Sequence, residues 1–367
     1  MNIKRSYYED IALFSSKTIA FWSCALFAGL ILLPFTVSGF TLSQINLIAI
    51  YIIVAVGLNI LVGYTGQVSL GHAGFFAIGA YGTVLLFSAF SWMPFSWMAF
   101  FPALLLAGII AALFGFILGV PSLRLEGPYL AIATLGFGMA IVQIIGRFRI
   151  FGGHNGLQVP ELNIFKGLIA SSGMVPSISI PNVELYFIIM PITVFLTILA
   201  RNIVKSRVGR AFIAIRDDDI AAQSMGVNLT YYKTLAFAVS AFYAGIAGGL
   251  FAFWIKFINP EPFSFIMSIT FLAMIVVGGI GTMPGAVAGA IVISYMEQNL
   301  TRDAIVQVPL LGDFVIYISN MFMDVGGIAN ISFIVFGAII ILIVVFEPLG
   351  LYGFWIRIKK YWKTWPF

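Results

Sequence analysis

The amino-acid sequence predicts an all-α polytopic membrane protein with about ten transmembrane helices, and three observations support this class. Hydrophobic residues make up 61% of the 367 residues and charged residues 9%, and the mean hydropathy is +1.06. In soluble proteins about 25% of residues are charged. Apolar runs of about 20 residues recur along the chain, and a helix needs that length to cross a bilayer. Strands of a membrane barrel would instead alternate apolar and polar residues over about ten positions.

Ten apolar runs are expected to cross the membrane. In chain order they comprise residues 18–40, 42–63, 71–87, 98–119, 129–145, 183–200, 234–254, 265–281, 286–296 and 328–346. The first run is longer than the apolar core of a signal peptide, so it is predicted to stay in the protein. The chain therefore divides into a polar lead of residues 1–17, one transmembrane domain of residues 18–346 and a basic tail of residues 347–367.

The connections between these runs differ in length and composition. Long polar loops are expected at residues 146–182 and 297–327, both on the same face of the membrane. The sequence GGIGTMPG joins the eighth and ninth runs, and its glycines allow close backbone approach or a helix break. Both termini fall on the other face, together with the charged residues 201–233.

The distribution of basic residues predicts the orientation in the membrane. Fourteen of the nineteen Lys and Arg residues fall on the face that holds both termini. The remaining five are Arg147, Arg149, Lys166, Lys256 and Arg302. Because cytoplasmic loops carry the excess of Lys and Arg, both termini and residues 201–233 are predicted to be cytoplasmic.

Residues 201–233 form the one long charged interruption among the apolar runs. They contain Arg201, Lys205, Arg207, Arg210, Arg216, Lys233 and the run Asp217, Asp218, Asp219. We expect two short helices, at residues 208–216 and 220–225, because the Asp run suits a helix N-cap and Gly226 suits a helix end. Phe212, Ile213, Ile215 and Ile220 are too apolar for a solvated loop. This pattern indicates a docking element for another protein.

A second unusual segment, GLNILVGYTGQVSLGHAGFFAIGAYG, spans residues 57–82. Its polar residues are Asn59, Tyr64, Thr65, Gln67, Ser69 and His72, set among seven glycines. Irregular backbone at membrane depth is tolerated where it is buried in protein or lines a watery cavity, and broken helices often bind transported substrates. A plain polar connection at the membrane surface, with His72 merely hydrogen-bonded, explains the composition equally well.

Four motifs in order give a family resemblance. GLNILVGYTGQVSLGHAGFFAIGAY, FGGHNGL, GRAFIAIRDDDIAAQSMGVNLTYYKTLAFAVSAFYAGIAGGL and GGIGTMPGAVAGA resemble the larger of the two paralogous permeases of branched-chain amino-acid ABC importers. The resemblance implies the ten-span, cobalamin-type importer permease fold, with a cytoplasmic coupling loop between the sixth and seventh spans. FGGHNGL departs from the family, in which Thr more often precedes the glycine pair and a small or polar residue replaces His154. His154 is therefore predicted to be an exposed loop residue rather than a ligand.

The resemblance also implies partners, location and residue roles. It implies two ABC ATPase subunits that bind ATP and Mg²⁺, a homologous second permease and a periplasmic or lipoprotein substrate-binding protein, in the cytoplasmic (inner) membrane of a bacterium or archaeon. Coupling to the ATPase is expected at Arg207, Arg210, Ala214, Arg216, Asp217, Asp218, Asp219 and Gly226. A substrate pathway is hypothesised at Tyr64, Thr65, Gln67, Ser69, His72, Phe75, Gly278 and Gly281.

The residues give little indication of ATP binding, catalysis or metal binding by this chain. The chain has no Gly-Lys dipeptide, so it lacks the P-loop that would bind ATP, and no cofactor, catalytic group or metal site is expected. The basic charge lies beside membrane spans, which argues against nucleic-acid binding. A urea or short-chain amide importer remains an alternative, and an ion-coupled secondary transporter is disfavoured because the assigned spans lack central carboxylates.

Overall fold

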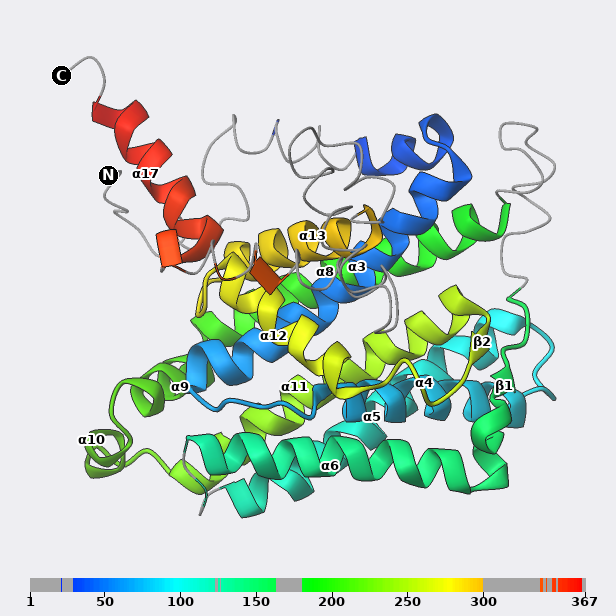
Figure 1. Ribbon diagram of the computed structural model, residues 1–367, viewed down its shortest axis with the longest axis horizontal. Coiled ribbons are helices and arrows are strands. Elements are labelled where there is room, and N and C mark those ends of the chain that lie inside the picture. Colours follow the sequence, from blue (N-terminus) through cyan, green and yellow to red (C-terminus); the bar gives the residue numbers. More distant parts are fainter. Residues whose placement is uncertain are drawn as a thin grey trace, which may run out of the picture.

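The computed structural model describes residues 21, 29–122, 125, 127–162, 180–299, 337–338, 341, 345–347 and 349–364. Helices dominate this part of the chain (Figure 1). The long helices are α3 (Gly39–Asn59), α4 (His72–Ala89), α5 (Ser96–Ser122), α6 (Pro128–Arg147), α8 (Ile180–Lys205) and α11 (Leu229–Ile255). The shorter elements are the π-helix η1 (Ile60–Tyr64), the 3₁₀ turns η2 (Arg149–Phe151) and η3 (Gly153–Asn155), and helices α9 (Arg207–Asp217), α10 (Asp219–Ser224), α12 (Phe265–Gly278), α13 (Met283–Asn299) and α17 (Gly350–Thr364).

The helices define two ends of the molecule. In Figure 1 the long helices α6 and α11 extend along the horizontal axis, α9, α10 and α17 lie toward the left end, and strands β1 (Leu157–Gln158) and β2 (Phe257–Ile258) lie at the right end. The two strands pair antiparallel, with Leu157 opposite Ile258. Nearby, the indole of Trp254 donates to the carbonyl oxygen of Ser43 at 3.0 Å, which joins the end of α11 to the start of α3.

Helix α11 forms the centre of the core and packs against α3, α4 and α5. Small residues allow its backbone to come close to its neighbours. A Cβ on Gly248 would collide with the carbonyl oxygen of Phe76 in α4. Such contacts between small residues are typical of helices that pack inside a membrane, where lipid provides no hydrophobic force between them. The phenol of Tyr243 in turn donates to the carbonyl oxygen of Leu196 at 2.9 Å and ties α11 to α8.

Six helices in the described part of the chain are long and apolar enough to cross a membrane. They coincide with the predicted runs at residues 42–63, 71–87, 98–119, 129–145, 183–200 and 234–254. The eighth and ninth runs form α12 and α13, which are shorter, with 14 and 17 residues. Most of the tenth run, and residues 18–20 and 22–28 of the first, lie outside the described residues. The structure therefore supports six of the predicted crossings, and the prediction of about ten rests on the sequence for the other four.

Predicted boundaries of both long loops are wrong by a few residues. In the loop expected at residues 146–182, α6 continues to Arg147 and α8 begins at Ile180. The other long loop is expected from Glu297, but α13 continues to Asn299. Glu and Gln are good helix formers, so two polar residues after an apolar run extend a helix as readily as they end it. His154, in η3, is exposed as predicted.

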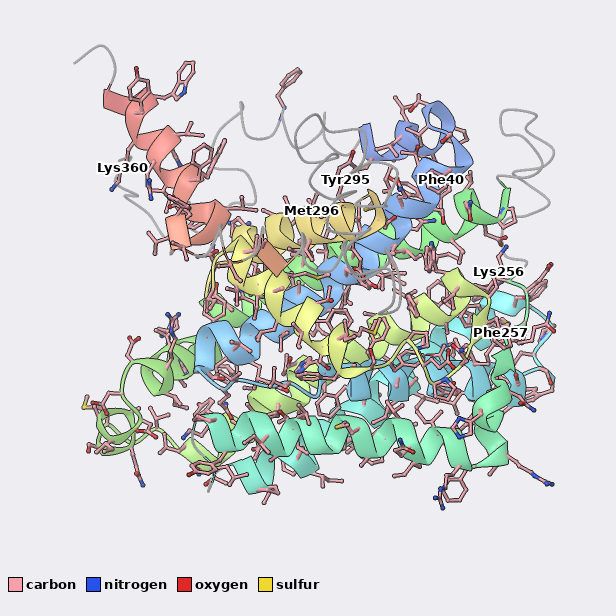
Figure 2. All side chains as sticks on the ribbon, in the orientation of Figure 1. Phe40, Lys256, Phe257, Tyr295, Met296 and Lys360 are labelled. Carbon is pink, nitrogen blue, oxygen red and sulfur yellow. The ribbon has the colours of Figure 1, made fainter. Side chains whose placement is uncertain are left out.

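In the part of the chain that the structure describes, basic residues separate between the two ends as the sequence predicts. Figure 2 labels Lys256 beside Phe257 at the right end and Lys360 at the left end, where α17 lies. Arg147 and Arg149 come at the end of α6 and in η2, next to the strands. The charged helices α9 and α10 lie at the opposite end.

This arrangement predicts which residues a membrane-impermeant thiol reagent reaches in intact cells. In a Cys24→Ser background, a single cysteine at exposed Asn155 should be labelled directly, because the strand end faces outward in the predicted orientation. A single cysteine at exposed Gln223 in α10 should be labelled only after the cells are permeabilised. Equal labelling of the two positions in intact cells would contradict the orientation.

Candidate functional site

The charged segment folds as the two predicted short helices. The side chain of Ser206 caps α9 by accepting from the amide of Val208 at 3.2 Å, and the carboxylate of Asp218 caps α10 by accepting from the amide of Ala221 at 2.9 Å. Gly226 then has a φ of +85°, a conformation that suits glycine and stops the helix. The local signals of the Asp run and of Gly226 are thus confirmed.

The apolar residues of this segment divide into two groups. Phe212 is 0% exposed and Ile215 is 5% exposed, because both pack against the body of the protein. They are therefore unavailable to a partner, which corrects their interpretation as docking residues. Their spacing with Val208 is the i, i+4, i+7 pattern of a helix face that turns toward a core. Ile220 and Met225, 75% and 86% exposed, remain on the outer surface.

The charged residues of the pair lie mainly on that outer surface. Arg207, Arg210, Asp217 and Gly226 are exposed, and Ala214 is half-buried. Asp219 forms an ion pair with Lys233 at 3.2 Å, which links α10 to the first turn of α11. Among the described residues, no three His, Cys, Asp or Glu side chains come together to hold a metal ion.

Arg216, at the end of α9, connects this surface to the transmembrane helices. Its Nη1 donates to the carbonyl oxygen of Gly63 at 2.6 Å, in the π-helix η1 that ends the α3 span. A π-helix turn leaves backbone carbonyls outside the regular ladder and is frequent at functional sites. A charged donor to a carbonyl is stronger than a neutral hydrogen bond, so this contact holds α9 against the end of the span.

The loop between α12 and α13 contacts the same region, where Arg216 meets the end of the α3 span. Buried Asn59 accepts from the amide of Gly281 at 2.9 Å through Oδ1, and its Nδ2 donates to the carbonyl oxygen of Thr282 at 3.0 Å. Gly281 has a φ of +77°, and a Cβ there would collide with Nη1 of Arg216. We call Asn59, Gly63, Arg216, Gly281 and Thr282 the joint. It joins α3, α9 and the α12–α13 loop, while Gly278 lies just beyond it, packed against Gly285.

The break in the first long motif starts at the joint. After Tyr64 the chain leaves helical structure until His72. Thr65 donates to the carbonyl oxygen of Leu61 at 2.5 Å and accepts from Nε2 of Gln67 at 2.9 Å. Gln67 is 6% exposed, and its Oε1 has no hydrogen-bond partner among the described residues. The break thus presents a buried acceptor.

The end of the break that leads into α4, residues 69–72, is hydrogen-bonded inside the protein. His72 lies 3.0 Å from the hydroxyl of Ser69 through Nδ1 and 2.7 Å from the hydroxyl of Ser240 in α11 through Nε2. All three side chains are 0% exposed, and so is Phe75, whose ring packs edge-on against the imidazole. The amide of Ala73 donates to Ser268 of α12 at 3.0 Å. These residues fix the start of α4 in the helix bundle.

Two cavities border the break. A polar cleft of about 440 Å³ opens beside the joint, and it is lined by Thr65, Gly66, Gln67, Val68, Leu125, Gly127, Leu130, Ile215, Arg216, Asp217, Asp218, Asp219 and Lys233. A largely apolar groove of about 350 Å³ lies between α6, α12 and the start of α4, and it is lined by Leu70, Ala73, Leu135, Gly138, Met139, Val142, Gln143, Phe263, Ser264, Phe265, Ile266 and Ser268. Both volumes fall within the roughly 300–1,000 Å³ of small-molecule sites.

Sequence reasoning missed the groove and the partner of Arg216. Leu135, Met139 and Val142 are apolar residues in an apolar helix, and composition does not distinguish lipid-facing from groove-facing positions. The pairing of Arg216 with Gly63 spans 153 residues and is a tertiary contact with no local pattern.

A family model described as the permease component of a branched-chain amino acid transport system matches residues 40–344. The chain is 37% identical over 286 residues to the high-affinity branched-chain amino acid transport system permease protein LivM of Escherichia coli K12, and the match covers 74% of this chain and 65% of that protein. It is 25% identical over 308 residues to the permease protein LivH of Salmonella typhimurium, with 83% of this chain and 91% of LivH covered.

The LivM protein of Salmonella typhimurium is 36% identical over 285 residues, again with 74% of this chain and 65% of that protein covered. The chain thus spans a little less than two thirds of the length of these LivM proteins. No solved structure matches it.

Loss of the Asn59 side-chain amide should destabilise the protein. Asn59→Leu leaves the amide of Gly281 and the carbonyl of Thr282 without this partner, and each buried polar group left unpaired costs roughly 1–3 kcal/mol. We expect a lower melting temperature in detergent than for the control Asn202→Leu, because Asn202 is exposed on α8. Equal melting temperatures for the two variants would show that the joint contributes little to stability.

Proposed function

Because the chain belongs to the branched-chain amino acid transport permease family, we propose that it is the membrane-spanning subunit of an ATP-binding-cassette importer that moves branched-chain, aliphatic amino acids into the cytoplasm. The family model over residues 40–344 and the identity to LivM support this proposal. The higher identity to LivM than to LivH supports assignment to the larger of the two permease paralogues.

The proposal includes partners that supply what this chain lacks. Two ATPase subunits would bind ATP and Mg²⁺, a homologous permease would complete the passage, and a periplasmic or lipoprotein binding protein would deliver substrate. The exposed outer surface of α9 and α10, with Arg207, Arg210, Ile220 and Met225, is the surface proposed for ATPase docking. Such a mix of apolar and charged residues on a short helix pair suits a groove on a partner protein.

The single observation that carries the coupling role is the hydrogen bond from Arg216 to Gly63. Motion of α9 and α10, driven by ATP binding and hydrolysis in the partners, would act through this bond on η1. Asn59 would carry the same displacement to the α12–α13 loop through its two hydrogen bonds. Both elements border the break, so the joint offers a direct mechanical route from the ATPases to it.

We place the substrate passage along the break, from the apolar groove to the polar cleft. The groove would accept the aliphatic side chain, and the acceptor Oε1 of Gln67 would meet the substrate ammonium group in the cleft. Tyr64, Thr65 and Gln67 would border the passage. Ser69, His72 and Phe75 would support its wall from within the core by fixing the start of α4. Gly278 and Gly281 would let the joint move without side-chain collision.

The apolar character of the groove favours an aliphatic substrate over urea or a short-chain amide. Urea offers only polar groups, whereas Leu135, Met139 and Val142 present a wall of hydrocarbon and thioether. Burial of one CH₂ group contributes about 0.8 kcal/mol, so such a wall selects for larger aliphatic side chains. We further propose the ten-span, cobalamin-type permease fold and the cytoplasmic location of both termini, in line with the family and the charge distribution.

Replacing Arg216 by Met should separate ATP hydrolysis from transport. The variant keeps an unbranched side chain similar to the aliphatic stem of Arg but loses the guanidinium donor to Gly63, a hydrogen bond worth about 1.5–3 kcal/mol when it involves a charged group. In reconstituted complexes we expect amino-acid uptake to fall several-fold while ATPase activity remains. Arg201→Met, at an exposed position on α8, is the control and should transport normally. Parental uptake per ATP hydrolysed in Arg216→Met would refute the coupling role of the joint.

Narrowing the groove should change substrate preference. Val142→Phe adds volume to the groove wall, so uptake of leucine and isoleucine should decrease more than uptake of valine. Ile144→Phe, on the exposed side of the same helix and outside the groove, is the matched control. Competition between labelled amino acids in proteoliposomes measures the preference. If both variants keep the parental order of substrates, the passage lies elsewhere.

A further inference from the structure

Helix α17 has one aromatic face and one basic face. At 3.6 residues per turn, most apolar side chains lie on one arc of the helix and the basic ones lie on the opposite arc, together with Tyr352 and Ile356. The apolar arc comprises Leu351, Phe354, Trp355, Ile358, Tyr361 and Trp362, and the basic arc includes Arg357, Lys359 and Lys360. This strong segregation is typical of a helix at a boundary between two environments.

The aromatic face points away from the rest of the protein. Phe354, Trp355, Tyr361 and Trp362 are 57%, 60%, 64% and 74% exposed. At the start of α17, half-buried Leu351 packs against the hydrophobic core, and the side that contacts the protein also includes buried Gly353. A surface helix in a soluble protein turns its apolar stripe toward the core, whereas α17 turns its aromatic residues from Phe354 onward away from it. Its aromatic face therefore needs another medium to cover it.

The start of α17 is held at the edge of the transmembrane helices. Gly350 has a φ of +64°, and a Cβ there would come within 2.6 Å of the amide nitrogen of Gly279, so the chain turns in direct contact with the end of α12. Arg357 pairs with Glu347 at 2.6 Å and fixes the first turns. Only residues 347–349 separate this turn from Val345 and Phe346, apolar residues that are 69% and 73% exposed.

This location places the aromatic face beside the lipid. Exposed apolar residues directly before α17 mark the level of the hydrocarbon, and three residues cannot carry the helix far from it. Figure 2 shows Lys360 at the end opposite to Lys256 and Phe257, and in Figure 1 that is also the end of α9 and α10.

We propose that α17 is an interfacial helix that binds the membrane surface, with its aromatic face at the headgroup boundary and its basic face toward anionic lipid headgroups. Trp and Tyr concentrate at this boundary because their rings are apolar and their edges are polar. Basic residues near the surface of an anionic leaflet are attracted to its headgroups. The positive charge of the basic arc is complementary to an anionic leaflet. The exposed aromatic rings suit the boundary between the headgroups and the hydrocarbon. A protein partner or a second copy of the chain is the competing occupant of this face.

The test uses spin labels on the full-length chain in vesicles. In a Cys24→Ser background, a nitroxide at position 354 and one at position 359 would be compared for collisions with oxygen, which concentrates in lipid, and with a water-soluble nickel chelate. In vesicles of phosphatidylethanolamine and phosphatidylglycerol, the oxygen-to-nickel ratio at position 354 should exceed that at position 359 several-fold. In a chain that also carries Lys359→Glu and Lys360→Glu, or in vesicles of neutral lipid, the ratio at position 354 should fall.

Each other outcome would overturn the proposal. Equal, high nickel access at both positions would place α17 in water. Low access to both reagents at position 354 would show that protein covers the aromatic face. An unchanged ratio at position 354 after removal of anionic lipid and of both lysines would refute the headgroup contribution. The readout needs neither ATPase subunits nor transport, so it stands apart from the proposed transport function.

Discussion

Arg216 crosses from a charged, water-facing helix to the end of a membrane span, and the rest of the candidate site is arranged around the carbonyl oxygen that it reaches. That carbonyl belongs to Gly63, and it is accessible because the span ends in a π-turn rather than in a regular helix. Asn59, one turn earlier, clamps the α12–α13 loop against the same point. A backbone carbonyl outside the regular helical ladder needs a hydrogen-bond partner, and here the guanidinium of Arg216 supplies one. The contact between the break and helix α9 therefore runs through the joint.

The break itself combines two requirements that usually conflict. At the end of the break that leads into α4, the buried polar groups need hydrogen-bond partners, because unpaired polar groups inside a membrane protein are costly. Ser69, His72 and Ser240 provide these partners for one another with uncharged side chains. At the end next to the joint, Oε1 of Gln67 has no hydrogen-bond partner among the described residues and lies beside a polar cleft. The segment would thus border the proposed passage without blocking it. The groove between α6 and α12 would continue the proposed passage with apolar side chains, which suits a substrate with one apolar side chain.

Much of this architecture could be predicted from the sequence, and the limits have physical reasons. Helix spans follow from apolar length, and α9 and α10 follow from the Asp218 cap and from Gly226, because these signals are local. The same local reasoning took Phe212 and Ile215 for partner contacts, although their spacing with Val208 already indicated a buried face. Contacts such as Arg216 with Gly63 join residues far apart in the chain, and a groove wall made of Leu, Met and Val has the composition of any lipid-facing helix. The sequence therefore located the break but not the cavities that follow it.

The central claim is that the joint transmits motion of α9 and α10 to the break, and accessibility of the break measures this most directly. A single cysteine at Val68, which lines the cleft, would be labelled in reconstituted complexes with and without a nonhydrolysable ATP analogue, in the parent and in Arg216→Met. The account predicts a nucleotide-dependent change in labelling rate in the parent and little or no change in the variant. The same nucleotide-dependent change in both would show that the signal reaches the break by another route and would contradict the account.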